Sequence, residues 1–159
     1  MPLNRKLASI AVTVITVLAL LTVSITILNY LGYAYPVEGR SMLPTIREGD
    51  LVFIVPASTR DVQVGQIVVY HRGGICIIHR VIEKIVSDNL VLLKTKGDNN
   101  PVPDPVLVSD SMLNGVVVVH LPYLGFLAMS PYRYILAVLL GLCVIYELFY
   151  ERREKRPVK

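Results

Sequence analysis

The sequence predicts a mainly β fold, in which a small antiparallel sheet or partly closed barrel is flanked by two transmembrane helices. Three observations lead to this class: an uncharged apolar run near each end, short β-rich runs between them, and a basic excess confined to the ends. The chain of 159 residues is 53% hydrophobic and only 18% charged, which excludes an intrinsically disordered protein. Its net charge of +4 sits at the two ends while the middle is nearly neutral, a pattern typical of membrane proteins and not of nucleic-acid-binding proteins.

The first element is an apolar run over residues 7–28, and no charge follows Lys6 until Glu38. As a helix this run would be about 33 Å long, slightly more than the roughly 30 Å of the hydrocarbon core of a bilayer. Arg5 and Lys6 precede it, so the positive-inside rule predicts a cytoplasmic N-terminus. A cleaved signal peptide is the alternative, because Gly32-Tyr33-Ala34 resembles a cleavage site. The run is longer than the usual apolar region of about 7–15 residues, which favours an uncleaved anchor.

The second apolar run predicts a transmembrane helix over residues 131–150. A basic segment, 151–159, follows it and should also be cytoplasmic. Because the uncharged part of the run, 134–146, is short, an amphipathic or buried C-terminal helix is the alternative. The expected parts are the cytoplasmic N-terminus with its helix (1–30), an extracytoplasmic β-rich catalytic domain (31–130), the second helix (131–150) and a basic cytoplasmic tail (151–159).

Between the two helices the sequence predicts short antiparallel strands. Runs rich in β-branched residues mark them at 51–55, 67–70, 75–82, 90–95 and 116–119. Turn residues at 72–74 and 87–89 separate consecutive runs. Short strands at this spacing, with no periodic helix between them, favour a small sheet or partly closed barrel. The following loop, 97–105, is too polar to be a strand.

Three groups of reactive side chains occur along this domain in the order nucleophile, base, acid. Ser41 lies in a loop, His79 lies on a predicted strand among apolar residues, and Asp98 and Asp104 lie in the polar loop. A serine hydroxyl needs a base within hydrogen-bond reach, and the base needs a third group to hold its tautomer. Each group alone also has a structural explanation, as a turn serine, a buried core histidine or a surface loop. The rival candidates for the base are His71 and His120.

We expect neither a metal nor another cofactor. Cys76 and Cys143 are too few for a thiolate metal site, and they lie in different parts of the chain, which argues against a disulfide between them. The loop that carries Asp98 and Asp104 lacks the regular ladder of ligands and the closing glutamate of a calcium loop.

Five short segments, taken together, resemble the ordered sequence boxes of type I signal peptidases. They are Ser41-Met42-Leu43-Pro44-Thr45, Gly49-Asp50-Leu51-Val52, Gly65-Gln66-Ile67-Val68-Val69-Tyr70, His79-Arg80-Val81 and Lys96-Gly97-Asp98-Asn99-Asn100. They follow one another in the order of that family and cover most of the predicted outer domain. The bacterial branch of the family has lysine as the base in the fourth box. His79 at this place resembles the archaeal and endoplasmic-reticulum branch.

The resemblance implies a membrane-anchored serine endopeptidase, a signal peptidase I, that removes N-terminal signal peptides from exported preproteins by cleaving after small residues. In that family Ser41 would be the nucleophile, His79 the general base, Asp104 the orienting carboxylate and Asp98 a second carboxylate of functional importance. The implied partners are signal-peptide-bearing preproteins and the lipid bilayer, with the protein-export channel as a further candidate, and no nucleic acid. The expected location is the archaeal cell membrane, with the endoplasmic reticulum as the alternative.

One departure from the family pattern precedes the serine. Members often have Ser-Gly-Ser-Met, and the earlier serine hydroxyl can help to stabilise the oxyanion, whereas here Gly39 and Arg40 precede Ser41. Losing such a donor typically costs about 3–4 kcal/mol of transition-state stabilisation. An alternative function is therefore a non-catalytic membrane-tethered β-module that binds or presents substrates to a partner peptidase. A self-cleaving protease of the repressor type is a weaker alternative, because that family uses lysine as the base and has no membrane anchor.

Overall fold

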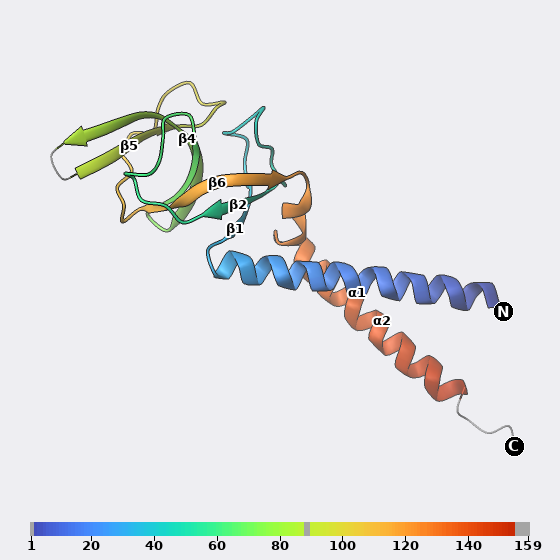
Figure 1. The fold of residues 1–159 in the computed structure, drawn as a ribbon. Coiled ribbons are helices and arrows are strands. Elements are labelled where there is room, and N and C mark those ends of the chain that lie inside the picture. Colours follow the sequence, from blue (N-terminus) through green and yellow to red (C-terminus); the bar gives the residue numbers. More distant parts are fainter. Residues whose placement is uncertain (1, 88–89, 155–159) are drawn as a thin grey trace, which may run out of the picture. The chain divides into compact units, whose positions relative to one another are not determined.

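The computed structural model describes residues 2–87 and 90–154 (Figure 1). The chain divides into two compact units. One is Ile27–Phe126, which we call the β-domain, and the other combines Met1–Thr26 with Leu127–Lys159. Two predicted features, turn residues 88–89 and the end of the basic tail at 155–159, lie outside the described residues.

The β-domain is built on one antiparallel sheet, which confirms the predicted β class. Its strands are β1 (Ala34–Pro36), β2 (Leu51–Val55), β3 (Ile67–Arg72), β4 (Ile75–Ser87), β5 (Leu90–Lys96) and β6 (Leu113–Leu121). Their order in the sheet is β1-β2-β6-β3-β4-β5, and every neighbouring pair is antiparallel (Figure 1). The sequence does not predict β1 or the 3₁₀ helix η1 (Leu124–Leu127), because elements of three and four residues are too short to show a periodicity.

The sheet is open, so the partly closed barrel is not formed. β1 and β5 are its edge strands, and the described residues contain no pairing between them. The course of β4 explains the opening, because its first part, Ile75–His79, pairs with β3 alone and β5 begins to pair only at Arg80. One backbone edge of Ile75–His79 therefore has no strand partner in the described part of the chain.

Two hydrophobic cores lie on opposite faces of β3. Val69 packs into the first core, with Met42 and Ile46 among its members, while Val68 and Tyr70 pack into the second. Successive side chains of a strand point to opposite faces, so a strand buried on both sides reads as the continuous apolar run that the sequence shows here. Because β3 is fixed from both sides and pairs with β4 along its whole length, it fixes the first part of β4 as well.

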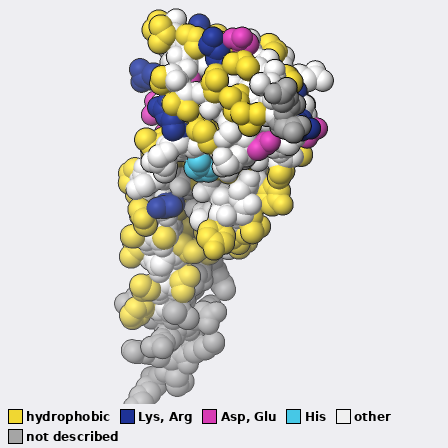
Figure 2. Space-filling model, turned by 90° about the vertical axis from the view of Figure 1, so that its left-hand side faces the viewer, with side chains coloured by type: hydrophobic (Ala, Val, Ile, Leu, Met, Phe, Trp, Pro, Cys, Tyr) yellow, Lys and Arg dark blue, Asp and Glu magenta, His cyan; other side chains and the backbone are white. Residues whose placement is uncertain are grey.

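The two long helices are α1 (Pro2–Tyr30) and α2 (Tyr132–Glu154). Among the described helices, only α1 is long and apolar enough to cross a membrane, over the 22 residues Ser9–Tyr30. The apolar stretch of α2 is limited to Tyr132–Tyr146, which is shorter than the predicted second membrane helix over residues 131–150. Glu147 and the charges after it end that stretch although the helix itself continues. In Figure 2 most charged side chains lie over the β-domain, and the described helical surface is largely hydrophobic.

Candidate active site

Ser41 lies in the loop between β1 and β2. Apolar residues that follow it in this loop anchor the loop to the first core. Met42 and Ile46 are both buried there, and the Ile46 N–H donates to the Met42 carbonyl at 3.0 Å. Ser41 itself is only half-buried. The apolar residue next to the serine thus fixes the backbone of the loop while the hydroxyl remains accessible.

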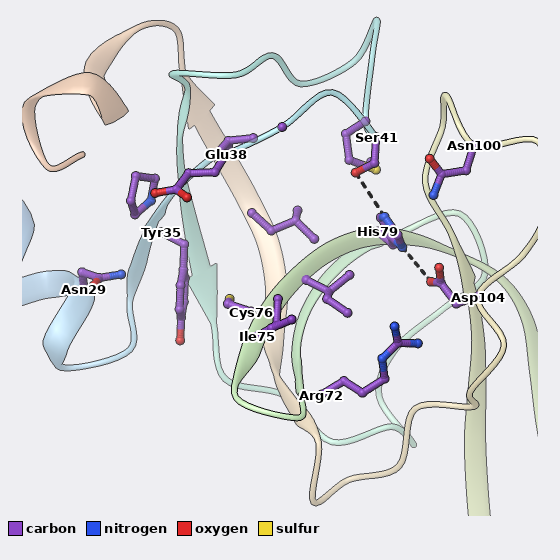
Figure 3. Close-up of a pocket in the computed structure, with 16 residues that line it drawn as sticks. Asn29, Tyr35, Glu38, Ser41, Arg72, Ile75, Cys76, His79, Asn100 and Asp104 are labelled. Atoms are coloured by element: carbon purple, nitrogen blue, oxygen red, sulfur yellow. Dashed lines mark hydrogen bonds and ion pairs between the residues drawn. The ribbon is translucent and has the colours of Figure 1, made fainter. Parts of the chain in front are cut away.

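His79 lies on β4 between two residues of the second core. Ile77 packs against this core and Val81 belongs to it, so the period-two pattern brings the imidazole to the same face, where it is 7% exposed. Its Nε2 lies 3.1 Å from Ser41 Oγ, and its Nδ1 lies 2.6 Å from Asp104 Oδ2 (Figure 3). Because a carboxylate faces Nδ1, the ring donates its proton there, and Nε2 is left to accept from the serine hydroxyl.

Three donors converge on one oxygen of Asp104. Besides His79 Nδ1, the Thr95 hydroxyl donates to Oδ2 at 2.6 Å and the Tyr70 hydroxyl donates at 2.9 Å. Burial raises the pKa of Asp104, but these hydrogen bonds outweigh it, and the pKa lies below its ordinary value. Burial above all raises the pKa of Tyr70 to about 12, so its hydroxyl remains a donor. Asp104 is therefore a buried but ionised carboxylate aimed at the imidazole.

Tyr70 and Thr95 also belong to the site, although the residues around them in the sequence do not predict it. A signal for Thr95 is present, because it continues the buried positions Val91 and Leu93 of β5 as a polar residue on an apolar face. A buried hydroxyl of this kind needs a hydrogen-bond partner. The partner is 9 positions further along the chain for Thr95 and 34 for Tyr70, so spacing alone could not identify it.

Asp98 takes no part in the described hydrogen bonds of His79. Arg80 binds it in a bidentate manner, with Nε 2.8 Å from Oδ1 and Nη2 2.7 Å from Oδ2, and the Thr45 hydroxyl donates to Oδ2 at 2.6 Å. The Arg80 guanidinium is the main reason why the pKa of Asp98 lies below its ordinary value. Thr45 belongs to the serine loop and Arg80 follows His79, so this ion pair joins three segments of the site. We call Asp98, Arg80 and Thr45 the clamp.

The rival histidines are placed elsewhere. His71 is exposed and its ring bonds to the Asn114 side chain. His120 has its Nδ1 3.4 Å from the buried carboxylate of Asp50. The described residues contain no group of three or more His, Cys, Asp or Glu side chains that could hold a metal ion.

Ser41 and His79 open onto a cleft of about 640 Å³. One wall is the segment 35–39, which includes the end of β1, and the other is 75–79, the part of β4 with the free edge (Figure 3). Met42 also lines the cleft. The cleft thus occupies the opening of the sheet and presents a free strand edge beside a hydroxyl–imidazole–carboxylate chain, an arrangement suited to acyl transfer on an extended peptide.

Comparison with known proteins gives a family match over most of this domain. The Peptidase S24-like family model matches residues 21–118. The signal peptidase complex catalytic subunit SEC11 of Candida tropicalis is 34% identical over 121 residues, which cover 67% of this chain and 72% of that protein. The SEC11 proteins of Lodderomyces elongisporus and Candida albicans are each 37% identical, over 121 and 123 residues, and in both the match covers 69% of this chain and 72% of the relative.

Proposed function

Because this chain belongs to the S24-like peptidase family, we propose that it is a signal peptidase, a serine endopeptidase that removes N-terminal signal peptides from exported preproteins. Its similarity to signal peptidase catalytic subunits over most of their length confirms the resemblance drawn from the sequence boxes. The single observation that carries the mechanism is the hydrogen-bonded series Ser41, His79 and Asp104 at the cleft. We assign the nucleophile, the general base and the orienting carboxylate to these residues in that order.

The reaction proceeds by two acyl transfers at Ser41. Its Oγ attacks the carbonyl carbon of the scissile bond, the hydroxyl proton passes to His79 Nε2, and the carbonyl electron pair moves onto oxygen. Collapse of this intermediate expels the amine of the mature protein, which takes the proton from His79, and leaves the signal peptide esterified to Ser41. Water then attacks the ester and gives a proton to His79, the bond between Ser41 Oγ and the acyl carbon breaks, and Oγ takes the proton from His79 as the signal peptide leaves with a free carboxyl group. Asp104 holds the imidazole and stabilises its charged form.

The free edge of β4 accounts for an extended substrate. A peptide between segments 35–39 and 75–79 can add as a strand, so that backbone hydrogen bonds provide affinity and wall side chains select residues. The walls carry Val37, Met42 and Ile78 close to the reacting serine. Such bulky walls favour small substrate side chains, which agrees with the expected cleavage after small residues.

Asp98 has a different role in this proposal. The clamp binds its carboxylate with Nε and Nη2 of Arg80 and with the Thr45 hydroxyl, and none of the described hydrogen bonds joins Asp98 to His79. We assign it to positioning, because it holds the loop of Asp104 against the loop of Ser41.

The proposed topology places the β-domain outside the cytoplasm. α1 supplies the anchor, and Arg5 and Lys6 before it favour a cytoplasmic N-terminus. We propose that α2 returns the chain to the cytoplasm despite its short apolar stretch, because basic residues follow it and Arg133 at its start can extend toward the headgroups. A site near the end of α1 meets the cleavage site of a signal peptide near the end of the peptide's own apolar helix. As the names of its relatives suggest, the chain would act as the catalytic subunit of a complex.

Cleavage of a preprotein by the purified full-length chain tests the enzyme against the non-catalytic module. We expect release of the signal peptide by the wild type and no detectable release by Ser41→Ala or His79→Ala. Thr59→Val, which removes a buried hydroxyl remote from the cleft, is a matched folding control and should keep its activity. Cleavage that persists unchanged in Ser41→Ala would overturn the assignment, and a wild type that binds preprotein without cutting it would favour the module.

A further inference from the structure

Acyl transfer at Ser41 needs hydrogen-bond donors for the oxyanion, and the serine loop supplies too few side-chain donors. The Ser41 N–H is one donor, since it has no acceptor among the described residues. Gly39 has no side chain, and the Arg40 guanidinium is turned toward Glu48, with Nε 3.5 Å from its carboxylate. The Thr45 hydroxyl is engaged by Asp98. A second donor must therefore come from another segment.

Asn100 brings a side-chain amide to this place. It ends a tight turn in which its N–H donates to the Gly97 carbonyl at 3.0 Å, and Pro101 restricts its backbone from the other side. It lines the same cleft as Ser41 and His79. Figure 3 shows its side chain extending from this loop toward these two residues.

Two hydrogen bonds from the neighbouring Asn99 fix the distance between Asn100 and the serine loop. The Asn99 N–H donates to the Ser41 carbonyl at 2.8 Å, and the Asn99 side chain donates to the Arg40 carbonyl at 3.2 Å. A Cβ on Gly97 would lie 2.7 Å from the Ser41 carbonyl oxygen and 2.8 Å from Asn100 Nδ2. Only glycine therefore permits this approach, and the two atoms that crowd it belong to Ser41 and to the Asn100 amide.

The Asn100 amide differs from those of the other asparagines that the structure describes in the β-domain. Asn29, Asn99 and Asn114 each donate from Nδ2 to a protein acceptor, at 2.8, 3.2 and 3.0 Å. The half-buried Asn100 side chain makes no hydrogen bond with any described residue. Partly buried amides normally have a partner, so an amide kept free beside a nucleophile is available to a substrate atom.

We propose that Asn100 Nδ2 is the second oxyanion donor and that it acts with the Ser41 N–H. When Ser41 Oγ bonds to the carbonyl carbon, the π electron pair moves to the oxygen, and the two N–H groups bind the resulting negative charge without transferring a proton. A neutral amide suits this task because it needs no counterion and stays on a rigid turn. Asn100 is in this account a catalytic residue. It supplies the side-chain hydrogen-bond donor that Gly39 and Arg40 do not provide for the oxyanion.

The inference rests on the proposed function, and substitution kinetics test it directly. With a preprotein substrate, we expect Asn100→Ala to lower kcat about 10²–10³-fold while KM stays close to the wild-type value, the loss typical for one oxyanion donor. Asn100→Asp, which has nearly the same shape but opposes a negative oxygen, should be at least as slow. Asn99→Ala is the matched control, because it keeps the bond from the Asn99 N–H to Ser41 and the Asn100 amide, and removes only the exposed side-chain bond to the Arg40 carbonyl. It should lower kcat far less than Asn100→Ala does.

A transition-state analogue separates a catalytic from a structural role. A peptide aldehyde ending in a small residue forms a hemiacetal oxyanion on Ser41, whereas the corresponding peptide alcohol has no carbonyl group and forms none. Asn100→Ala should weaken aldehyde binding by a factor like its loss in kcat and leave binding of the peptide alcohol unchanged. Equal weakening of both ligands would show that Asn100 has a structural role, and an unchanged kcat would favour a backbone donor; either result would overturn the inference. If the wild type fails to cleave, or Ser41→Ala still cleaves, the proposed function itself is wrong.

Discussion

At the scale of residues, the site depends on the different environments of two carboxylates in one loop. Asp104 accepts from Tyr70, Thr95 and His79, whereas Asp98 accepts from Arg80 and Thr45. Both pKa values lie below their ordinary range, so both groups are ionised at neutral pH. Only Asp104 touches the imidazole. In the proposed mechanism the same residue type thus serves orientation of the imidazole at one position and attachment of the loops at the other.

Exchange of each carboxylate for an amide separates these roles. Asp104→Asn should lower kcat by about 10⁴-fold, because a side-chain amide no longer fixes the ring tautomer that lets Nε2 accept from Ser41. Asp98→Asn should lower kcat much less and instead reduce the free energy of unfolding by about 2 kcal/mol through loss of charged hydrogen bonds. Steady-state kinetics and chemical denaturation of both variants measure these effects. A larger loss of kcat in Asp98→Asn would contradict the assignment.

The hydroxyls that donate to Asp104 should determine the pH below which activity is lost. Thr95→Val removes a hydrogen bond that stabilises the ionised carboxylate, so the pKa of Asp104 rises and activity is lost at a higher pH on acidification. The pH profile of kcat/KM measures the shift. Thr59→Val, whose buried hydroxyl donates to the Val91 carbonyl away from the site, should leave the profile in place. A shift of equal size in both variants would show that the effect is not specific to Asp104.

At the scale of elements, the clamp holds together the segments that form the site. The Arg80–Asp98 pair joins β4 to the loop after β5, and Thr45 adds the serine loop. This contact and the hydrogen bond from Asn99 to Ser41 cross between two loops that have no strand pairing with each other. The precision of the site therefore comes from polar contacts between loops that two buried cores support.

Because of the clamp, we expect the folded protein to lose stability in acid. The pKa of Asp98 is lowered in the folded state, so its contribution is present above the unfolded-state pKa of about 4 and is lost as the pH falls through the folded-state value. Melting temperatures measured between pH 7 and pH 3 should fall for the wild type, and Asp98→Asn should begin lower and fall less steeply. Parallel curves for the two proteins would contradict this role.

Much of this arrangement could be predicted from sequence where the pattern is local. The alternation along residues 75–82 indicates the buried face of His79, and the long uncharged run indicates α1. The sequence could not indicate where the sheet opens, because this depends on β5 pairing only from Arg80 onward. It could not separate Asp98 from Asp104 by geometry either, since Tyr70 and Thr95 select Asp104 through contacts made by folding.

At the scale of the whole molecule, the chain combines one long apolar helix with a domain that carries most of the charge. The 22-residue span Ser9–Tyr30 of α1 is long and apolar enough to cross a bilayer, whereas the apolar part of α2 ends at Tyr146. Attachment to the membrane would confine enzyme and substrate to one plane, which raises their effective concentration and restricts their orientation. The path of α2 decides on which side the C-terminus lies.

Protease protection of a C-terminal tag tests the proposed topology. In sealed vesicles with the β-domain outside, added protease should digest the β-domain and leave the tag intact, because α2 returns the chain to the lumen that corresponds to the cytoplasm. Permeabilised vesicles serve as the control, in which the tag should be lost. Loss of the tag in sealed vesicles would mean that α2 stays on the outer side.

The most direct test of the central claim is the site at which an electrophilic signal-peptide analogue becomes covalently attached. A peptide that ends in a small residue and an acylating group should modify the wild type once, at the tryptic fragment that carries Ser41, as measured by mass spectrometry. Because His79 must accept the hydroxyl proton, His79→Ala should not be modified on the same timescale. Modification of another residue, or equal modification of Ser41 without the imidazole, would contradict the account.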